Sequence, residues 1–275
     1  PARNLKITVD KDAVVRNGIV PESMKDQIVD EIVWRIPESV GYLYKNDLML
    51  LDFMATNNWT RAVYFTSLSD IKNVLGIDKY LHQEGLSHRF MPVLAYDYHK
   101  DAGGVYVDGS YELLMSDDIS WGNLNLPDVS VDPESRRNVL FVKQAYMRLA
   151  QSLLNLHQND SAILVLDKCQ EFFPNEKIPY DFYMMAYPEI YYKAGAVEKG
   201  DKLINDIVDN MVDNLNYYSR LDDRFVSYYA EDIRENLAMI NEMSNVAKKH
   251  NRLELSVSLE NILEQEFNKF LGLFQ

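Results

Sequence analysis

The sequence is short of cysteine, of positive charge and of long apolar runs, and each shortage excludes a class of protein. Cys169 is the only cysteine among 275 residues, which excludes an intrachain disulfide framework and a cysteine-based zinc cage. The 28 lysines and arginines face 42 aspartates and glutamates, giving a net charge of −14, so we expect no nucleic-acid partner. The longest uncharged stretch, Leu149–Asn159, is far shorter than the ~20 apolar residues of a membrane span, so we expect no direct membrane insertion.

Glycine and proline are scarce in the second half of the chain. Residues 1–137 contain 14 of the 20 glycines and prolines and all three tryptophans. Residues 138–275 contain the other six glycines and prolines and no tryptophan. The stretch Leu126–Arg137 is rich in turn-forming residues, so we place the boundary there. We predict a mixed α/β domain over residues 1–130 and a helical domain over residues 131–275.

The first domain has the patterns of both strands and helices. Leu5, Ile7 and Val9 alternate with polar residues, which is typical of a strand with one solvent-exposed face. The predicted elements are this strand, a helix that follows Pro21 and carries Ile28–Val33, a helix over Asn46–Asn57 capped by Asn46, strands at 62–66 and 89–94, and a hairpin arm at 105–107.

The second domain is helical throughout, and its first part contains a repeat. Six helices are predicted, at 138–157, 160–173, 180–194, 196–218, 223–249 and 252–272. One unit has the spacing of a tetratricopeptide repeat, with Tyr146, Leu149, Ala150, Leu153, Ala162, Leu166, Cys169 and Pro174.

A weaker copy of the repeat follows, displaced by 38 rather than 34 residues because the connection 175–180 is longer by about one turn. Pro188 lies inside its first helix and should kink that helix or delay its start. The two copies resemble the tetratricopeptide family, although other helical hairpins can mimic the pattern. The predicted fold class is therefore an α+β N-terminal domain followed by an all-α tetratricopeptide-like helical-repeat domain.

Residues that could carry chemistry are few. The sequence has no glycine-rich phosphate loop, HExxH, GxSxG or EF-hand motif. His82, His88 and Glu84 could form a metal site, as could the alternating Asp97, His99 and Asp101, but surface or partly satisfied side chains explain both groups better. We therefore expect no metal, no cofactor and no catalytic residue in this chain.

Three motifs occur in a fixed order in the first domain: KNDLMLLD at Lys45–Asp52, NNWTRAVYF at Asn57–Phe65 and YLHQEGLSHRFMPV at Tyr80–Val93. Followed by tetratricopeptide-like helices, this order resembles the soluble C-terminal part of the domain-of-unknown-function 2723 family, bacterial membrane proteins similar to protein O-mannosyltransferases. Ala62 departs from the pattern, in which proline is expected. The motif residues that carry the resemblance are Asn58, Trp59, Arg61, Tyr64, Phe65, Glu84, Gly85, Arg89 and Pro92.

The resemblance implies a parent protein with an N-terminal bundle of membrane helices, and the absence of an initiator methionine at Pro1 leads us to expect a fragment. It also implies that the catalytic acids and the lipid-linked sugar site lie in or beside that bundle. The parent would then be a lipid-linked-sugar-dependent protein O-glycosyltransferase, and this chain its tail on the periplasmic face of the bacterial inner membrane. Its partners would be a protein or glycan acceptor and the membrane-embedded part of the same polypeptide.

A binding groove can be placed by the register of the repeat, because the first helix of each tetratricopeptide pair lines the concave face. The predicted groove positions are Gln144, Met147, Gln151 and Asn155 from the first unit and Met185, Glu189, Tyr192 and Lys193 from the second. Tyr192 is the one exposed exception that we expect among tyrosines that otherwise fill seams between helices. The alternative is that the last helices or the first domain fill this groove.

Three functions remain open on the sequence. The first is a non-catalytic domain of a membrane glycosyltransferase-like protein that binds an acceptor or partner. The second is a free-standing tetratricopeptide-type adaptor, and the third is an autonomous hydrolase or carbohydrate-binding protein.

Overall fold

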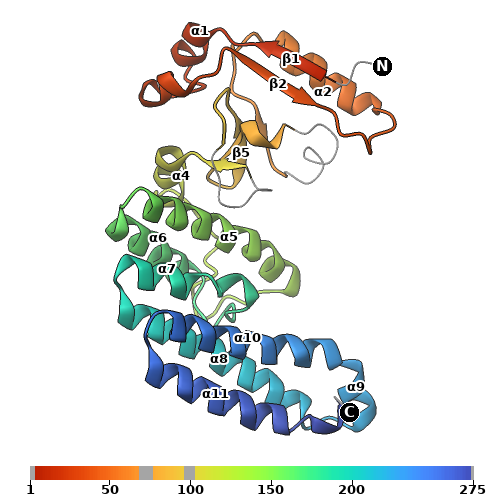
Figure 1. Cartoon of the computed structure of the whole chain (residues 1–275), viewed down its shortest axis with the longest axis vertical. Coiled ribbons are helices and arrows are strands. Elements are labelled where there is room, and N and C mark those ends of the chain that lie inside the picture. The colour runs from red at the N-terminus through yellow and green to blue at the C-terminus, as the bar shows by residue number, and fades with distance from the viewer. Residues whose placement is uncertain (1–3, 68–76, 96–102, 274–275) are drawn as a thin grey trace. The chain divides into compact units, whose positions relative to one another are not determined.

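The computed structural model describes residues 4–67, 77–95 and 103–273. The chain divides into two compact units, an N-terminal unit (Pro1–Ser116) and a helical unit (Asp117–Gln275), which Figure 1 shows in colours from red to blue. The N-terminal unit mixes strands with short helices, and the second half of the chain is mostly helical. The predicted order of an α+β region followed by a helical region is therefore confirmed.

Two small sheets form the N-terminal unit. β1 and β2 pair antiparallel, with Ile7 opposite Ile32, and the second sheet has the order β3-β5-β4-β6 with β6 parallel to β4. The described elements are β1 (Asn4–Thr8), α1 (Lys11–Arg16), the 3₁₀ helix η1 (Glu22–Gln27), β2 (Glu31–Arg35), α2 (Lys45–Thr56), β3 (Tyr64–Phe65), η2 (Asp78–Tyr80), β4 (Leu81–Glu84), β5 (Ser87–Phe90), β6 (Gly104–Val105) and α4 (Val107–Leu114).

The prediction of a helix that carries Ile28–Val33 is wrong. Only η1 is helical there, and the chain continues as the strand β2. In β2, Ile32 and Trp34 are buried while the residues between and around them are exposed, a period of two. Ile28, Val29, Ile32 and Val33 fit both a helical and a strand period, and pairing with β1 selects the strand.

Two smaller expectations also change. The hairpin arm at 105–107 is instead β6, which runs parallel to β4, and Val107 begins α4. Helix α2 covers the predicted range, but its N-cap is Tyr44, whose backbone N–H donates to Asp47 Oδ2 at 2.8 Å. Asp47 rather than Asn46 therefore completes the cap.

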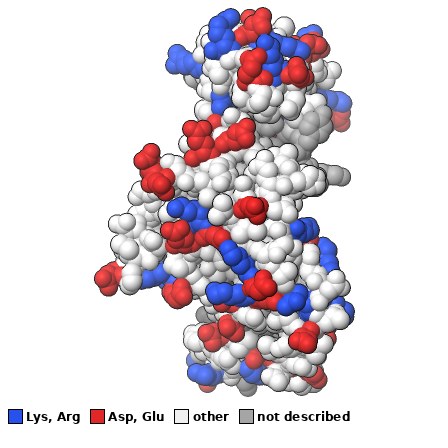
Figure 2. Space-filling view, turned by 90° about the vertical axis from the view of Figure 1, so that its left-hand side faces the viewer, with Lys and Arg blue, Asp and Glu red and all other residues white. Residues whose placement is uncertain are grey.

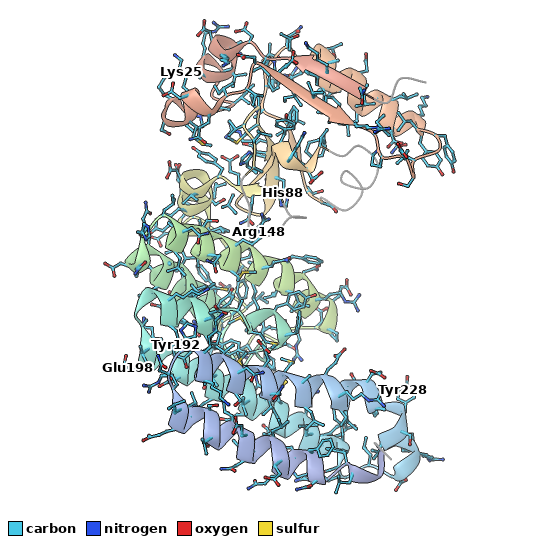
Figure 3. All side chains as sticks on the ribbon, viewed as in Figure 1. Lys25, His88, Arg148, Tyr192, Glu198 and Tyr228 are labelled. Atoms are coloured by element: carbon cyan, nitrogen blue, oxygen red, sulfur yellow. The ribbon has the colours of Figure 1, made fainter. Side chains whose placement is uncertain are left out.

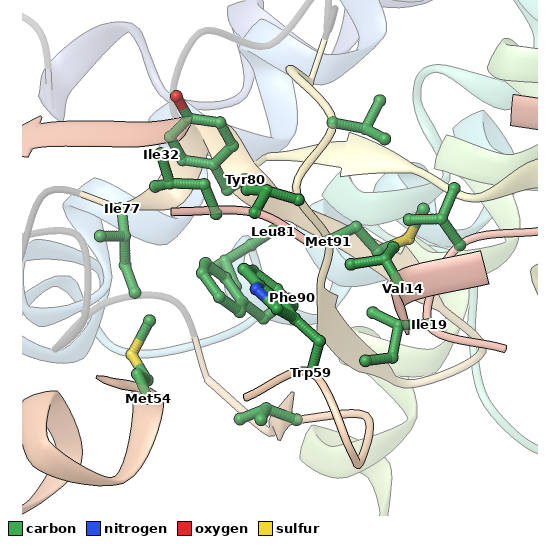
Figure 4. Close-up of a cluster of buried hydrophobic side chains, with 14 of the residues drawn as sticks. Val14, Ile19, Ile32, Met54, Trp59, Ile77, Tyr80, Leu81, Phe90 and Met91 are labelled. Carbon is green, nitrogen blue, oxygen red and sulfur yellow. The ribbon is translucent and has the colours of Figure 1, made fainter. Parts of the chain in front are cut away.

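The N-terminal unit packs around two stacked aromatic rings. Trp59 and Phe90 lie 5.9 Å apart between centroids with an angle of 12° between the rings, at the centre of the cluster in Figure 4. Leu81 from the second sheet, Met91 directly after β5 and Val14 from α1 belong to the same cluster and are fully buried. This core fixes the position of β4 and β5, which carry the third sequence motif.

Four of the six helices predicted for the helical unit are present near their predicted ranges. The helix predicted at 180–194 begins only at Tyr187, and the helix predicted at 223–249 is divided at Tyr229 into two helices. The helices pack as antiparallel pairs, α5 on α6, α7 on α8 and α10 on α11, visible side by side in Figure 1. The described elements are α5 (Pro133–Asn155), α6 (Asn159–Phe172), η3 (Phe182–Met184), α7 (Tyr187–Ala194), α8 (Val197–Tyr218), α9 (Asp223–Tyr228), α10 (Ala230–Lys249), α11 (Leu253–Asn268) and η4 (Leu271–Leu273).

The first helical pair meets through small residues, as the repeat spacing predicts. Ala150 on α5 and Ala162 on α6 are both fully buried. Asp132 caps α5 by accepting hydrogen bonds from the backbone N–H groups of Glu134 and Ser135, at 2.9 and 3.1 Å. These observations establish a tight helical hairpin, which is a coarser statement than a tetratricopeptide repeat.

Helix α7 is much shorter than its neighbours. It has 8 residues, whereas α5 has 23, α8 has 22 and α10 has 20. Pro188 lies in its first turn, so the delayed start predicted for this helix is confirmed. Relative to α10, about 12 residues or ~18 Å of helix are missing at its N-terminal end. The segment 174–186, with the single turn η3, takes the place of that helix.

Candidate functional site

Three of the motif residues meet in the second sheet of the N-terminal unit. Tyr64 on β3 pairs with Arg89 on β5, and Glu84 ends β4 beside it. Arg89 Nη1 donates to Glu84 Oε1 at 3.0 Å and to Oε2 at 3.2 Å, with only 10% and 11% of the two side chains exposed. Burial and a hydrogen bond to Glu84 raise the pKa of Tyr64 to about 12.

The Arg89 guanidinium forms its hydrogen bonds with other groups of the N-terminal unit. Arg89 Nη2 also donates to the carbonyl of Gly18, which joins the sheet to the end of α1. The Arg89 guanidinium lies 5.7 Å from the centroid of the Tyr64 ring. At Gly109 an added Cβ would come within 2.8 Å of Glu84 Oε1, so only glycine leaves room there. The geometry is that of an internal ion pair that holds secondary-structure elements together.

The tryptophan motif also serves the fold. The Trp59 indole N–H donates to the Thr8 carbonyl at 3.1 Å, and Asn17 Nδ2 donates to the Trp59 carbonyl at 2.7 Å. Asn58 and Trp59 have φ values of 47° and 56°, a left-handed pair that turns the chain from α2 toward β3. Such a backbone is sparsely populated for a bulky residue, and the contacts of the indole hold it in place.

The remaining motif residues divide between core and surface. Phe65 is buried, Gly85 occupies the left-handed position of the β4–β5 turn with φ 63°, and the Pro92 carbonyl accepts from Val29 N–H at 3.0 Å. Asn58 and Arg61 are exposed. Tyr64 is also exposed, at 48%, although it lies beside Arg89, and the other family-motif residues named from the sequence are parts of the folded core and its turns.

The histidine hypotheses have different outcomes. His82 is buried on β4, with Nε2 2.9 Å from the Val93 carbonyl. In the described ranges no three histidine, cysteine or acidic side chains gather as metal ligands would. Asp97, His99 and Asp101 lie outside the described residues.

The groove positions predicted on α5 share one helix face. Gln144 and Asn155 are exposed, whereas Met147 and Gln151 are half-buried. Gln151 Nε2 donates to Asn155 Oδ1 at 3.3 Å. These four residues are accessible, and their role in binding stays a prediction.

The positions predicted on and before α7 have a different environment. Met185 is half-buried directly after η3, and Lys193 is exposed. Glu189 accepts from Lys193 at 2.7 Å and from Lys249, at the end of α10, at 2.8 Å. Burial raises the pKa of Glu189, but the two lysines outweigh it and lower the pKa below its usual value.

The expectation that Tyr192 is exposed is wrong, because only 8% of the residue is accessible. Its ring stacks on His250 at 4.9 Å, and its hydroxyl donates to Asp201 Oδ1 at 2.7 Å. Arg252 holds the same carboxylate through Nε at 3.0 Å and Nη2 at 2.5 Å. Burial and the bond to Asp201 raise the pKa of Tyr192.

The turn between α10 and α11 therefore covers this end of α7. Lys249 ends α10, and His250 and Arg252 follow it in the turn, about 60 residues along the chain from Glu189. The sequence left open whether the groove is free or filled by another part of the chain. At Glu189 and Tyr192, residues of the last helices pack on the predicted groove positions. Figure 2 shows this side of the helical unit, where acidic and basic side chains are interspersed.

A cleft lies where α7 is short. Its volume is about 530 Å³, and we call it the α5–α8 cleft. One wall is the start of α5, with Arg136, Arg137 and Leu140, the floor is the segment 178–181, and the other wall is α8 from Asn210 to Asn214. Both arginines are exposed, as is Asp213 on the opposite wall. The floor thus carries Ile178, Pro179 and Tyr180 beside the acidic Asp181, and it lies between one wall with two arginines and another wall with Asp213.

Hydrogen bonds keep the cleft wall in place. Asn210 Nδ2 donates to Asn175 Oδ1 at 2.8 Å and to the Tyr180 carbonyl at 3.1 Å. Asn214 Nδ2 donates to Asn236 Oδ1 at 3.1 Å. The sequence analysis did not assign these residues, although the 38-residue spacing of the repeat already indicated an insertion at 175–180. That insertion is the signal that could have located the cleft.

A buried lysine lies next to the cleft. Lys143 is 0% exposed, its Nζ has no hydrogen-bond partner in the described part of the chain, and it lies 5.5 Å from the centroid of the Tyr180 ring. Burial lowers the pKa of Lys143, although the nearby Asp181 acts in the opposite direction. Tyr180 and Asp181 line the cleft, so Lys143 lies close behind its floor.

The single cysteine is packed in the same region. The Tyr187 hydroxyl donates to the Lys143 carbonyl at 2.7 Å and lies 3.3 Å from Cys169 Sγ. Cys169 is buried, and burial raises the pKa of its thiol to about 12. A thiol with so high a pKa is a poor nucleophile at neutral pH.

Comparison with protein-family models gives a match within the N-terminal unit. Residues 1–108 match the model of a family described as TMEM260-associated domain 2, and this range contains every motif residue from Asn58 to Pro92. Neither the curated proteins nor the solved structures gave a match. None of the described helices is both long and apolar enough to span a membrane. The N-terminal unit is thus similar to TMEM260-associated domain 2, and the helical unit lies outside the matched range.

Proposed function

We propose that this chain is a non-catalytic part of a larger membrane glycosyltransferase-like protein and that its helical unit holds the acceptor polypeptide. The observation that carries this proposal is the α5–α8 cleft. The apolar residues of its floor suit apolar side chains of an extended segment. The two arginines on one wall suit acidic or polar groups of that segment, and Asp181 and Asp213 suit basic or polar groups. A cleft with such walls favours binding of a chain over binding of a small apolar ligand.

The assignment to a membrane glycosyltransferase rests on the three sequence motifs. Their order resembles the domain-of-unknown-function 2723 family, whose members are similar to protein O-mannosyltransferases. On that resemblance we propose that the chain lies on the periplasmic face of a bacterial inner membrane, attached to a bundle of membrane helices. The catalytic acids would belong to that bundle, and the parent would transfer a sugar from a lipid carrier to protein.

The candidate reactive groups of this chain support a non-catalytic role. Glu84 and Arg89 bind each other and are nearly buried, and the Cys169 thiol is buried with a raised pKa. A general base or nucleophile must be able to reach its substrate, and these groups cannot. We therefore expect the isolated chain to transfer no sugar from a lipid-linked donor, and measurable transfer by residues 1–275 alone would overturn this part of the proposal.

The cleft is tested in the full-length parent. Arg136→Glu combined with Arg137→Glu reverses one wall of the cleft, and we expect glycan occupancy on acceptor proteins, measured by mass spectrometry, to fall at least fivefold. The control is Arg16→Glu combined with Lys45→Glu, which makes the same change of charge at exposed positions of the N-terminal unit. Equal occupancy in the two double variants would show that the cleft does not hold the acceptor.

The second candidate is a free-standing tetratricopeptide-type adaptor. The tight α5–α6 hairpin, with buried Ala150 and Ala162, favours it. An adaptor would act without a membrane part of its own, so a gene that encodes membrane helices upstream of Pro1 would decide against it.

A further inference from the structure

Four tyrosines form a continuous array of rings, two of them at the end of α8 and two where α9 ends and α10 begins. Tyr218 and Tyr229 stack, with centroids 5.1 Å apart and 27° between the rings. Tyr217 stands edge-on to Tyr218 at 5.6 Å and 65°, and Tyr228 stands edge-on to Tyr229 at 5.1 Å and 87°. We call these residues the tyrosine array. Two stacked inner rings are thus flanked by one outer ring on each side.

The outer rings of the array are open to solvent. Tyr228 is 80% exposed and Tyr217 is 59% exposed, whereas Tyr218 and Tyr229 are partly covered. Buried tyrosines at other helix seams, such as Tyr187 and Tyr191, use their rings for packing. Figure 3 shows Tyr228 beside α9, at the end of the helical unit opposite to Tyr192. Packing within the described residues therefore does not account for the exposed outer rings.

The surroundings of the array are acidic. Residues 213–235 contain six acidic and three basic side chains. Of the three bases, Arg234 is paired with Glu231, and the Arg224 guanidinium lies 4.5 Å from the centroid of the Phe225 ring. Burial raises the pKa of Tyr218, and the nearby Asp232 carboxylate raises it further. Exposed ring faces in a negative field attract cations, because the face of an aromatic ring is itself electronegative.

We propose that the tyrosine array binds an arginine side chain in a basic, extended segment of a partner protein. Arginine suits the array better than lysine, because its planar guanidinium stacks on aromatic rings and loses less hydration. The net charge of −14 adds long-range attraction for a basic partner. The proposal is independent of the acceptor role of the α5–α8 cleft, since it uses other residues and a different kind of partner group.

In the experiment, a hexapeptide of alternating glycine and arginine with blocked termini is titrated into the chain of residues 1–275, and isothermal titration calorimetry measures the binding. A matched peptide carries citrulline in place of arginine, which keeps the planar shape and removes the charge. We expect binding of the arginine peptide to weaken at higher salt and the citrulline peptide to bind at least tenfold more weakly. Equal binding of the two peptides would overturn the proposal.

Variants then locate the binding site. Tyr217→Leu combined with Tyr228→Leu removes the two outer rings, and we expect at least a tenfold loss of affinity. Tyr217→Phe combined with Tyr228→Phe keeps the rings and should bind within about twofold of the wild type. Tyr42→Leu combined with Tyr183→Leu removes two exposed tyrosines elsewhere and should have no effect.

The contrary outcomes are distinct. A similar loss in the control variant would mean nonspecific attraction by the acidic chain, and a similar loss in the phenylalanine variant would mean that hydroxyl groups rather than ring faces make the contact. Maltohexaose is titrated in parallel as a neutral ligand. Tighter binding of this oligosaccharide, lost in the leucine variant, would identify a carbohydrate platform and refute the basic partner.

Discussion

The two units place their charged and aromatic side chains differently. In the N-terminal unit several of the side chains that define the sequence motifs turn inward, so that Arg89 binds Glu84 and Trp59 packs on Phe90. In the helical unit the arginines of the α5–α8 cleft and the outer rings of the tyrosine array face solvent. The sequence motifs thus lie among residues that bond internally, whereas the candidate binding surfaces lie outside residues 1–108, which the family model matches.

The largest expected effect tests the internal ion pair of Glu84 and Arg89. We predict that Arg89→Met destabilises the N-terminal unit by about 4 kcal/mol, because Glu84 is left charged and nearly buried. Denaturant unfolding followed by tryptophan fluorescence measures the change. Glu84→Leu combined with Arg89→Met should cost less than Arg89→Met alone, since no charge is then left unpaired.

The matched control for this variant is Arg35→Met, which removes the partner of Glu38 in an exposed pair. Such surface pairs contribute about 0–1 kcal/mol. If the Arg35 and Arg89 variants lose the same stability, the inward motif is not what holds the N-terminal unit together.

A second prediction concerns the covered end of α7. Tyr192→Ala should destabilise the helical unit by about 3 kcal/mol, because it removes a buried ring and leaves Asp201 without one of its donors. Gln151→Ala, at a half-buried and accessible groove position, should stay within about 0.5 kcal/mol. Thermal unfolding measured at 222 nm compares the two, and a harmless Tyr192→Ala would contradict the packing on His250.

The third prediction tests the seam between α5 and α6. Ala162→Leu should cost about 2 kcal/mol, because a larger side chain overpacks the contact of two fully buried alanine positions. Ala238→Leu is the matched change at an exposed position on α10 and should be nearly neutral. An unchanged melting temperature for Ala162→Leu would refute close approach of the two helices.

The smallest expected effect is a gain in stability from Lys143→Met. Methionine has a similar volume and removes a buried amine that has no partner in the described residues, so we expect about 1 kcal/mol of stabilisation at pH 7. The pKa of Lys143 is lowered from 10.5 in the folded chain, so the unfolded chain binds more protons and the stability of the wild type rises with pH.

It follows that the advantage of Lys143→Met should shrink as the pH approaches 10.5, where the unfolded chain also loses the proton. Urea unfolding of the variant and the wild type at pH 7, 8.5 and 10 measures this difference. A gain that stays constant over this range would mean that Lys143 titrates normally.

Local sequence patterns predict most helices of the helical unit. The apolar stripes give the helices of the second unit to within a few residues in most cases, and Pro188 gives the late start of α7. The strand β2 could not be predicted in the same way, because Ile28, Val29, Ile32 and Val33 fit two periods and its identity depends on pairing with β1. Local pattern decides an element only where a single period fits.

The candidate sites depend on contacts between distant parts of the chain. Repeat register placed Tyr192 on an open groove, but His250 and Arg252 cover it from 58 and 60 residues further along the chain. The α5–α8 cleft arises from missing helix, which no apolar stripe records. The sequence motifs named Tyr64, Glu84 and Arg89, but the inward-facing ion pair of Glu84 and Arg89 follows only from the sheet that brings the three residues together.

The left-handed turn at Asn58 and Trp59 has a consequence for mutational tolerance. Glycine at residue 59 would relieve the backbone but lose the bond to Thr8 and the stacking on Phe90, whereas phenylalanine or tyrosine would keep part of the packing and retain the strained backbone. No single substitution satisfies both demands. Residue 58 is exposed, and its only requirement is a backbone in the left-handed region, so glycine or aspartate should be accepted there. In a library that randomises both codons, selection for folded protein should therefore fix one residue and leave its neighbour variable.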